Sequence, residues 1–363
     1  EQMFNALHSI KQSSWKGWLN PEDHLALEIV GLKESISFNV LCPKKLQDLV
    51  EKQIHATYPG ARIKEIDEPN IFSEGGKVAF TALNLKHGTS RPIKTYRDLP
   101  TDPLNLITAA FSKLQDGEGA ILQILIEPAS DKWRDQAQSY VRKEREAETG
   151  TDGKPKKVID HKALEAITTK TEKMGFRVAL RVIVSSPDEY SAQSHLTNII
   201  GALAQFTSQH NYFTKCRTWI KQAFMVDFLY RYFPFFGQNT FVLNTEELAT
   251  LFHFPNKTVE THHIEWLNAK NAPAPSQIPN EGLYLGKSIY MGVERKIYMS
   301  LEDRRRHMYI VGKTGTGKSE FLKEMILQDI EAGHGVCAID PHGEFVEDLL
   351  ELMPPERAED VIY

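Results

Sequence analysis

Cysteine is scarce in this chain: its 363 residues include only Cys42, Cys216 and Cys337, far apart in the sequence. Three scattered thiols do not make a disulfide framework, and they lack the paired spacing of a zinc site. We therefore expect the fold to depend on its hydrophobic core. So few cysteines are typical of proteins in a reducing compartment, which favours the cytoplasm.

Long apolar runs and an excess of positive charge are also missing. No stretch of roughly 18 apolar residues occurs, and the first residues lack a basic segment followed by an apolar one, so we expect neither a membrane span nor a secretion signal in these residues. The formal net charge of −5 excludes a global basic field, and any nucleic-acid surface must be a local patch. The remaining composition, 41% hydrophobic and 25% charged, is ordinary for a globular protein of two or three domains.

The most informative stretch, residues 308–330, reads MYIVGKTGTGKSEFLKEMILQDI. It contains the pattern G-x-x-x-x-G-K-[ST], a loop whose backbone N–H groups surround the phosphates of a nucleotide. The predicted nucleotide-binding residues are Gly312, Lys313, Thr314, Gly315, Thr316, Gly317, Lys318 and Ser319. The glycines allow a tight backbone and a close approach to phosphate, Lys318 reaches the phosphate oxygens, and the hydroxyl of Ser319 suits Mg²⁺.

The residues around this loop favour the same assignment. Met308–Val311 is an apolar run typical of a strand, and apolar residues recur at helical spacing after Ser319. A second predicted strand, Val336–Ile339, completes a β-α-β unit. The helix that follows the loop adds an N-terminal dipole that favours an anion, so ATP with Mg²⁺ is the expected ligand.

The N-terminal two-thirds read as an α/β domain. The patterns predict strands at 25–31, 35–42, 61–67, 77–85, 120–126 and 176–184, and helices at 43–58, 104–114 and 188–206. A hairpin, a helix and a returning strand form half of a ferredoxin-like sandwich, and the same kinds of element recur later in the chain. The fold-class prediction is α/β: an α+β ferredoxin-like N-terminal part followed by the start of a RecA-like P-loop NTPase domain.

Three segments of this part leave a function open. A charged helical hairpin at about 130–174 is predicted as an insertion, and its basic tip (Lys154, Lys156, Lys157) either contacts DNA or is merely solvated. The aromatic stretch Trp219–Phe236, with Arg231, either packs a helix on the domain, stacks bases or lies on a membrane surface. His253, His262 and His263 lie close in sequence, but nothing completes a metal-ligand set there.

A proline-rich linker divides the chain. The stretch 271–280, NAPAPSQIPN, places prolines at alternate positions, which keeps it extended. The predicted organisation is therefore an adaptor domain over 1–270, a linker over 271–282 and the N-terminal part of a P-loop ATPase domain over 283–363. Short strands are expected near 283–285, 288–291 and 296–300.

Two motifs together resemble a known family. RHMYIVGKTGTGKS, followed by IDPHGE, resembles the HerA/FtsK-type DNA-pumping ATPases, most closely their conjugation-type (type IV secretion) branch. The upstream segment LNTEELATLFHFP also looks like the stretch preceding the motor in such proteins, so the resemblance spans residues 246–363. It implies an ATPase that forms a hexamer around duplex DNA, binds ATP between subunits and contacts membrane-embedded secretion components at the inner face of the membrane.

The resemblance also assigns roles to single residues. Lys318 and Ser319 match the phosphate and Mg²⁺ positions, and Asp340 matches an acidic residue that reaches the metal or the attacking water. Glu344 is the alternative for that catalytic role, or else it interacts with a helix dipole. Arg306, or its neighbour Arg304 or Arg305, either reaches a γ-phosphate at a subunit edge or belongs to a solvated basic turn.

The family's Asp-Glu metal strand and its later arginine finger do not occur in these residues, so we expect an excerpt of a longer motor that binds ATP without turnover. Two alternatives to a DNA translocase stay open. One is a nucleotide-gated assembly module at a membrane apparatus, and the other is a protein-threading ATPase.

Overall fold

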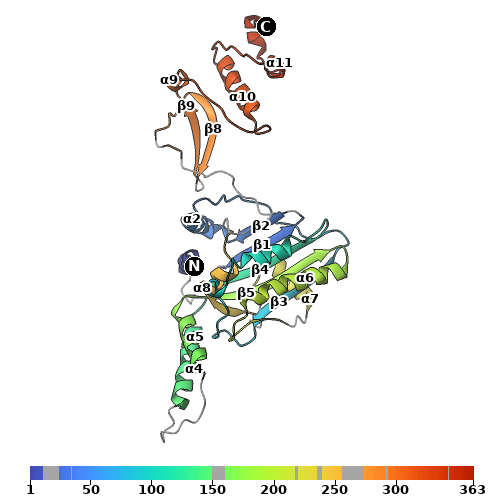
Figure 1. Ribbon diagram of the computed structural model, residues 1–363, viewed down its shortest axis with the longest axis vertical. Coiled ribbons are helices and arrows are strands. Elements are labelled where there is room, and N and C mark those ends of the chain that lie inside the picture. The colour runs from blue at the N-terminus through green and yellow to red at the C-terminus, as the bar shows by residue number, and fades with distance from the viewer. Residues whose placement is uncertain are drawn as a thin grey trace. The chain divides into compact units, whose positions relative to one another are not determined.

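The computed structural model describes residues 1–10, 24–33, 35–148, 160–216, 220–234, 239–255, 274–275, 277–290, 293–341 and 343–363. They form two compact units, Glu1–Asn268 and Ala269–Tyr363, which we describe separately. Figure 1 shows the elements of each unit. Several residues discussed above lie outside the described residues: Lys154, Lys156, Lys157, Trp219, Phe235, Phe236, His262, His263 and part of the linker.

Unit 1 is built on one seven-stranded sheet. Its strands are β1 (Leu25–Leu32), β2 (Ser35–Leu41), β3 (Lys77–Leu85), β4 (Gly119–Pro128), β5 (Gly175–Ser186), β6 (Phe213–Lys215) and β7 (Phe241–Asn244). Its α-helices are α1 (Gln2–Leu7), α2 (Gln47–Thr57), α3 (Leu104–Phe111), α4 (Lys132–Glu148), α5 (His161–Glu172), α6 (Glu189–Leu203), α7 (Lys221–Leu229) and α8 (Thr245–Leu251). The strand order is β2-β1-β4-β5-β3-β6, with β7 beside β5, and all neighbours are antiparallel. The mixed α/β class is thus confirmed.

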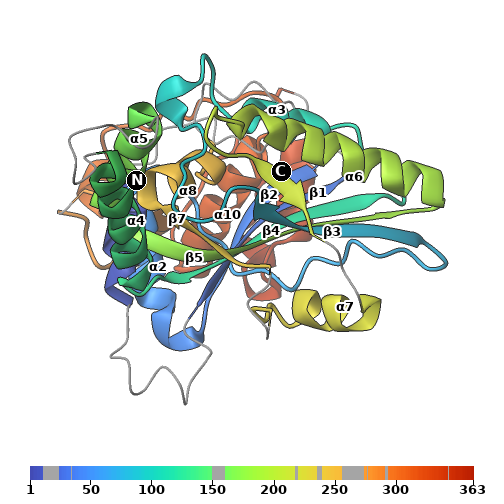
Figure 2. The same ribbon diagram turned by 90° about the horizontal axis from the view of Figure 1, so that it is seen from below.

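Helices cover both faces of this sheet, as Figure 2 shows with α3 and α6 on one side and α7 on the other. The main core joins the first face to α2, α3, α6 and α8, whereas a smaller core on the second face includes Phe224 and Phe228 of α7. Because β4 and β5 are covered on both sides, nearly all of their residues are buried.

Several helices begin where a side chain can bond the free backbone N–H groups of the first turn. The carboxylate of Asp188 accepts the Ser191 N–H at 2.9 Å and starts α6, as expected from the sequence. Asn244 and Glu247 form a reciprocal capping box at α8. Each of these caps joins residues three positions apart in the sequence.

The predicted strand at 61–67 is wrong. Residues 61–70 have no regular secondary structure, and Ile63 and Ile66 are exposed. Both sides of β1 are already occupied, by β2 and β4, so a strand returning from α2 cannot pair with β1. The segment is charged, and its two isoleucines are three residues apart, which does not match the two-residue period of a strand.

The strand order differs from two consecutive similar halves. In the sheet, four strands lie in the order β4-β5-β3-β6. Helix α3 connects β3 to β4, and β5 lies between these two strands. Helix α6 connects β5 to β6, and β3 lies between them. This is the order of two interleaved split β-α-β units, and β1 with β2 extends it beyond β4. The helices α4 and α5 lie between β4 and β5 in sequence. A ferredoxin-like domain stays a prediction.

A row of polar side chains crosses the second face of the sheet. Glu28 of β1 lies opposite Gln123 of β4, and Gln123 lies opposite Arg181 of β5. All three are buried, and Gln123 bonds Glu28 at 2.8 Å and Arg181 at 2.9 Å. Burial lowers the pKa of Arg181 to about 10. Since a buried charge must be paired or hydrogen-bonded, this row requires further partners, which α7 supplies.

Unit 2 consists of a β-hairpin and helices. The hairpin pairs β8 (Leu283–Tyr290) with β9 (Val293–Met299), and the α-helices are α9 (Leu301–Arg304), α10 (Lys318–Glu331) and α11 (Glu344–Glu351). The strand predictions near 283–300 thus merge into one antiparallel hairpin.

The predicted parallel β-α-β unit is not formed. Residues 308–311 and 336–339 have no strand assignment, and within the described part of unit 2 the strand pairing is confined to β8 and β9. A strand exists only as part of a hydrogen-bonded ladder, so an apolar run without a neighbouring strand stays irregular. Tyr309 and Ile339 accordingly lie almost fully exposed. In the described residues, no helix combines the length and the apolar character that a membrane span needs.

Candidate nucleotide-binding site

The loop over 312–319 adopts a conformation that only glycine accommodates at three points. Gly315 and Gly317 have φ values of 80° and 82°, in the left-handed region. At Gly312, a Cβ would lie 2.5 Å from the Thr316 Oγ1 and 3.2 Å from the Lys318 Cγ. Gly315 and Gly317 are therefore required by the backbone conformation, and Gly312 is required because a Cβ would clash with neighbouring side chains.

One carbonyl organises the inside of the loop. The oxygen of Lys313 accepts bonds from the Thr316 hydroxyl at 2.7 Å, the Thr316 N–H at 3.3 Å and the Lys318 ammonium at 3.0 Å. Lys318 thus bends back over the loop that precedes it. Its positive charge is held at the loop by a neutral acceptor, which an anionic phosphate can replace with a stronger charge-assisted bond.

The loop leads directly into α10, whose N-cap is Gly317 and whose first turn is therefore not capped by a side chain. The first backbone bond within α10 runs from the Phe321 N–H to the Gly317 carbonyl, so the N–H groups of Lys318, Ser319 and Glu320 have no intrahelical partner. Together with the helix dipole, these groups make a site for an anion. Most of the loop is exposed, so a ligand can reach it.

Side-chain bonds that the sequence did not reveal hold α10 to the rest of unit 2. The amide of Gln328 bonds both the N–H and the carbonyl of Tyr284 in β8, at 2.9 and 3.0 Å. Lys323 bonds Asp348 of α11 at 2.9 Å. The elements that flank the phosphate loop are thus fixed by polar contacts, each joining residues at least 25 positions apart.

Arg304, one candidate for a γ-phosphate contact, is bonded within its own unit. Its guanidinium contacts both oxygens of Asp329 on α10, one of them at 2.6 Å, and this side-chain bond raises the pKa of Arg304. The bidentate pair connects α9 to α10. Arg305 and Arg306 are exposed on the same turn.

The two predicted acidic residues lie at the start of α11. Asp340 accepts the Phe345 N–H at 3.1 Å, so its carboxylate helps to start this helix. Glu344 is exposed in the first turn of α11, where a negative charge interacts favourably with the dipole. Their contact with a metal or an attacking water stays a prediction.

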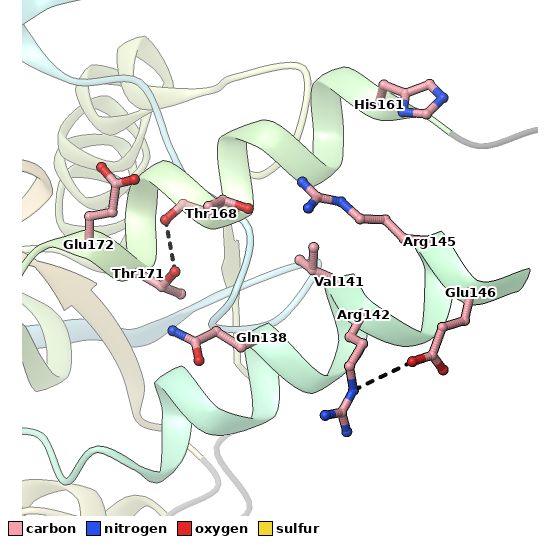
Figure 3. Close-up of a pocket in the computed structure, with 9 residues that line it drawn as sticks. All are labelled: Gln138, Val141, Arg142, Arg145, Glu146, His161, Thr168, Thr171 and Glu172. Carbon is pink, nitrogen blue, oxygen red and sulfur yellow. Dashed lines mark hydrogen bonds and ion pairs between the residues drawn. The ribbon is translucent and has the colours of Figure 1, made fainter. Parts of the chain in front are cut away.

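His253, the described member of the histidine group, has structural partners. His253 bonds Asp102 at 3.0 Å and the Ala249 carbonyl at 3.0 Å. Among the residues that the structure describes, no three His, Cys, Asp or Glu side chains are arranged to hold a metal ion. A groove of about 780 Å³ between α4 and α5, shown in Figure 3, contains none of the predicted site residues.

A buried polar cluster around Glu118 was not predicted from the sequence. Glu118 accepts bonds from the Ser186 hydroxyl at 2.6 Å and the Gln115 N–H at 2.8 Å, and lies 2.9 Å from the His195 ring. Burial alone would raise the pKa of Glu118, but these bonds and the interaction with His195 outweigh it, so the pKa is lowered. The cluster joins β4, β5 and α6, and we assign it a structural role.

The loop and the open helix start together have the features of a P-loop-type phosphate site. ATP with Mg²⁺ fits this site, because the free N–H groups and the ammonium of Lys318 suit phosphate oxygens and the hydroxyl of Ser319 suits the metal.

The chain belongs to the family described as a domain of unknown function (DUF8128), whose model matches residues 1–267. Residues 283–361 match the model described as helicase HerA, central domain, which supports a HerA-like ATPase family assignment for this part of the chain. The search of curated proteins gave no match.

Proposed function

We propose that this chain is the ATP-binding part of a motor subunit that couples ATP hydrolysis to translocation of duplex DNA. The observation that carries the proposal is the phosphate loop at an uncapped helix start, in a segment that matches the HerA central domain. Lys318 would bind the phosphates and Ser319 the Mg²⁺. Asp340, with Glu344 as the alternative, would hold the metal or orient water.

The first test is nucleotide affinity. In Lys318→Ala the phosphate loses a charge-assisted contact worth about 1.5 to 3 kcal/mol, so the Kd for Mg-ATP should rise roughly 10- to 150-fold in titration calorimetry. Lys296→Ala, which removes the same charge from β9, is the matched control and should bind as the parent does. Equal affinities in all three proteins would refute the site.

The second test concerns the transported polymer. If the motor moves duplex DNA, DNA should stimulate its ATPase activity. The stimulation should fall steeply as the salt concentration rises, because lysines and arginines that bind the phosphates displace counterions from the DNA. Stimulation by an unfolded polypeptide would instead identify a protein-threading ATPase. Nucleotide-dependent assembly without stimulation by either polymer would identify a gated assembly module. A homo-hexamer follows from the same proposal, since a nucleotide held between subunits suits a closed ring.

For unit 1 we infer a ferredoxin-like adaptor within a conjugation or type IV secretion-like system, at the inner face of the membrane. The order β4-β5-β3-β6, with crossover helices α3 and α6, supports the ferredoxin-like part. Co-purification of the chain with membrane-embedded components of such a system, lost when residues 1–270 are deleted, is the expected result.

A further inference from the structure

The helix α7 and the turn after it expose far more apolar surface than the other helices that cover the sheet. The exposed fractions are 63% for Ile220, 47% for Val226, 43% for Leu229, 65% for Tyr230 and 51% for Tyr232. We call these five side chains the α7 surface. By contrast, the longer α6 exposes one large apolar side chain, Tyr190, and α3 exposes one, Leu106. Single exposed side chains are normal, whereas a gathered set marks an interaction surface.

The opposite side of α7 is held to the sheet by polar bonds. Arg181 bonds the carbonyls of Asp227 and Tyr232, at 2.9 and 2.5 Å, and Gln123 bonds the carbonyl of Phe228 at 3.2 Å. Arg231 bonds the Leu229 carbonyl at 2.8 Å and the buried carboxylate of Glu28 at 3.1 Å. Carbonyl groups at a helix C-terminus usually need water. Here the polar row and Arg231 bond three of them and also the Tyr232 carbonyl of the following turn, so the α7 surface can leave water without stranding these groups.

The composition of the α7 surface suits the boundary of a lipid bilayer. Tyr230 and Tyr232 stack at a ring-centroid distance of 5.7 Å, and each combines an apolar ring with a hydroxyl. Tyrosines with this property concentrate where an apolar medium meets water. One exposed cation, Lys221 at the start of α7, has no ion pair among the described residues and would complement anionic headgroups.

The size of the surface disfavours a stable contact with a second copy of the chain. The five side chains expose on the order of 500 Å², whereas a stable protein interface takes about 800 Å² from each partner. Insertion into a headgroup region has no such lower limit, because binding grows with the apolar area buried and with charge attraction.

We propose that the α7 surface docks on an anionic phospholipid bilayer, with its apolar side chains at the acyl boundary and Lys221 among the headgroups. This inference does not depend on the nucleotide site. Lys318→Ala should therefore bind vesicles as the parent does, which separates a failure here from a failure of the ATP proposal.

The test is flotation of the chain with phosphatidylcholine vesicles that contain phosphatidylserine. The variant Leu229→Ser/Tyr230→Ser should bind at least about tenfold more weakly. Its matched control is Leu106→Ser/Tyr190→Ser, which makes the same substitutions on the other side of the sheet and should bind as the parent does. Lys221→Gln should bind about fivefold more weakly, and pure phosphatidylcholine should bind little of any variant.

Three results would overturn the proposal. The first is vesicle binding that the α7 double variant leaves unchanged. The second is no flotation of the parent chain with anionic vesicles. The third is a parent chain that self-associates in light scattering and dissociates in the α7 double variant, because the surface would then be a contact between copies. Unchanged far-UV circular dichroism verifies that each variant is folded.

Discussion

A buried ion pair between α5 and α8 gives a sharp test of how unit 1 is held together. The side chains of Lys170 and Glu247 are both fully buried, and their charged atoms lie 3.0 Å apart. The carboxylate of Glu247 also accepts the N–H groups of Ile93 and Asn244, each at 2.9 Å. Burial lowers the pKa of Lys170, although Glu247 opposes this effect. One carboxylate thus serves three buried donors, and the Lys170 ammonium also contacts the Arg91 carbonyl at 3.4 Å.

Removing that carboxylate should be costly. Glu247→Ala strands a buried ammonium, which costs about 3 to 5 kcal/mol, and leaves two buried N–H groups without acceptors at about 1 kcal/mol or more each. We expect a total loss of about 5 to 7 kcal/mol, which is comparable to the whole stability of many domains, so this variant can fail to fold. Glu247→Gln keeps the shape and one acceptor oxygen, and should lose about 2 to 3 kcal/mol.

Tryptophan fluorescence in urea is the assay, because Trp133 is buried in unit 1 and the sequence has no tryptophan after residue 268. With a slope near 3 kcal/mol per molar urea, Glu247→Gln should lower the midpoint by roughly 0.8 M. Lys170→Met should partly restore Glu247→Gln, with a coupling of about 1 kcal/mol or more, because it removes the stranded charge. Glu165→Gln, on the exposed side of α5, is the control. A Glu247→Gln midpoint equal to that of the parent would refute the reasoning.

Three further predictions follow from other sites. The pKa of Glu118 is lower in the folded protein than its ordinary value of 4.5, so the ionised carboxylate stabilises the fold fully above pH 4.5, and this stabilisation is lost as the pH falls through the folded pKa. In Glu118→Gln the urea midpoint should therefore vary less with pH below 4.5 than it does in the parent. Gly312→Ala should weaken Mg-ATP binding about tenfold or more by displacing the loop side chains, while Gly335→Ala, with open space around it, should bind normally. In the full-length motor, Asp340→Asn keeps an acceptor for α11 and should bind ATP but lower kcat about 100-fold, whereas a loss of turnover in Glu344→Gln alone would transfer the role to that residue.

The phosphate loop shows how much local sequence can predict. The pattern at 312–319 predicted a glycine-dependent turn before a helix, and Gly315, Gly317 and α10 have those conformations. Helix starts such as Asp188 were predictable for the same reason, because a cap is formed between residues three positions apart. Such interactions do not require the rest of the fold.

Apolar patterns alone were insufficient for strands. The runs 308–311 and 336–339 have the composition of strands, but a strand forms only with a neighbour, and the described part of unit 2 pairs neither. The segment 61–67 failed for a related reason, since both positions beside β1 are occupied. Whether an apolar run becomes a strand is thus decided by the sheet around it.

The sequence by itself determined the phosphate loop, the helix starts and most strands of unit 1, because each depends on residues close together in the chain. Only the tertiary structure decided which polar residues are buried and paired. In the sequence, three polar residues each look isolated within an apolar strand: Glu28, Gln123 and Arg181. In the structure they are neighbours, because the register of β1, β4 and β5 places them opposite one another. Lys170 and Glu247 likewise meet across 77 positions. Register and helix packing are non-local, so no short pattern encodes these pairings.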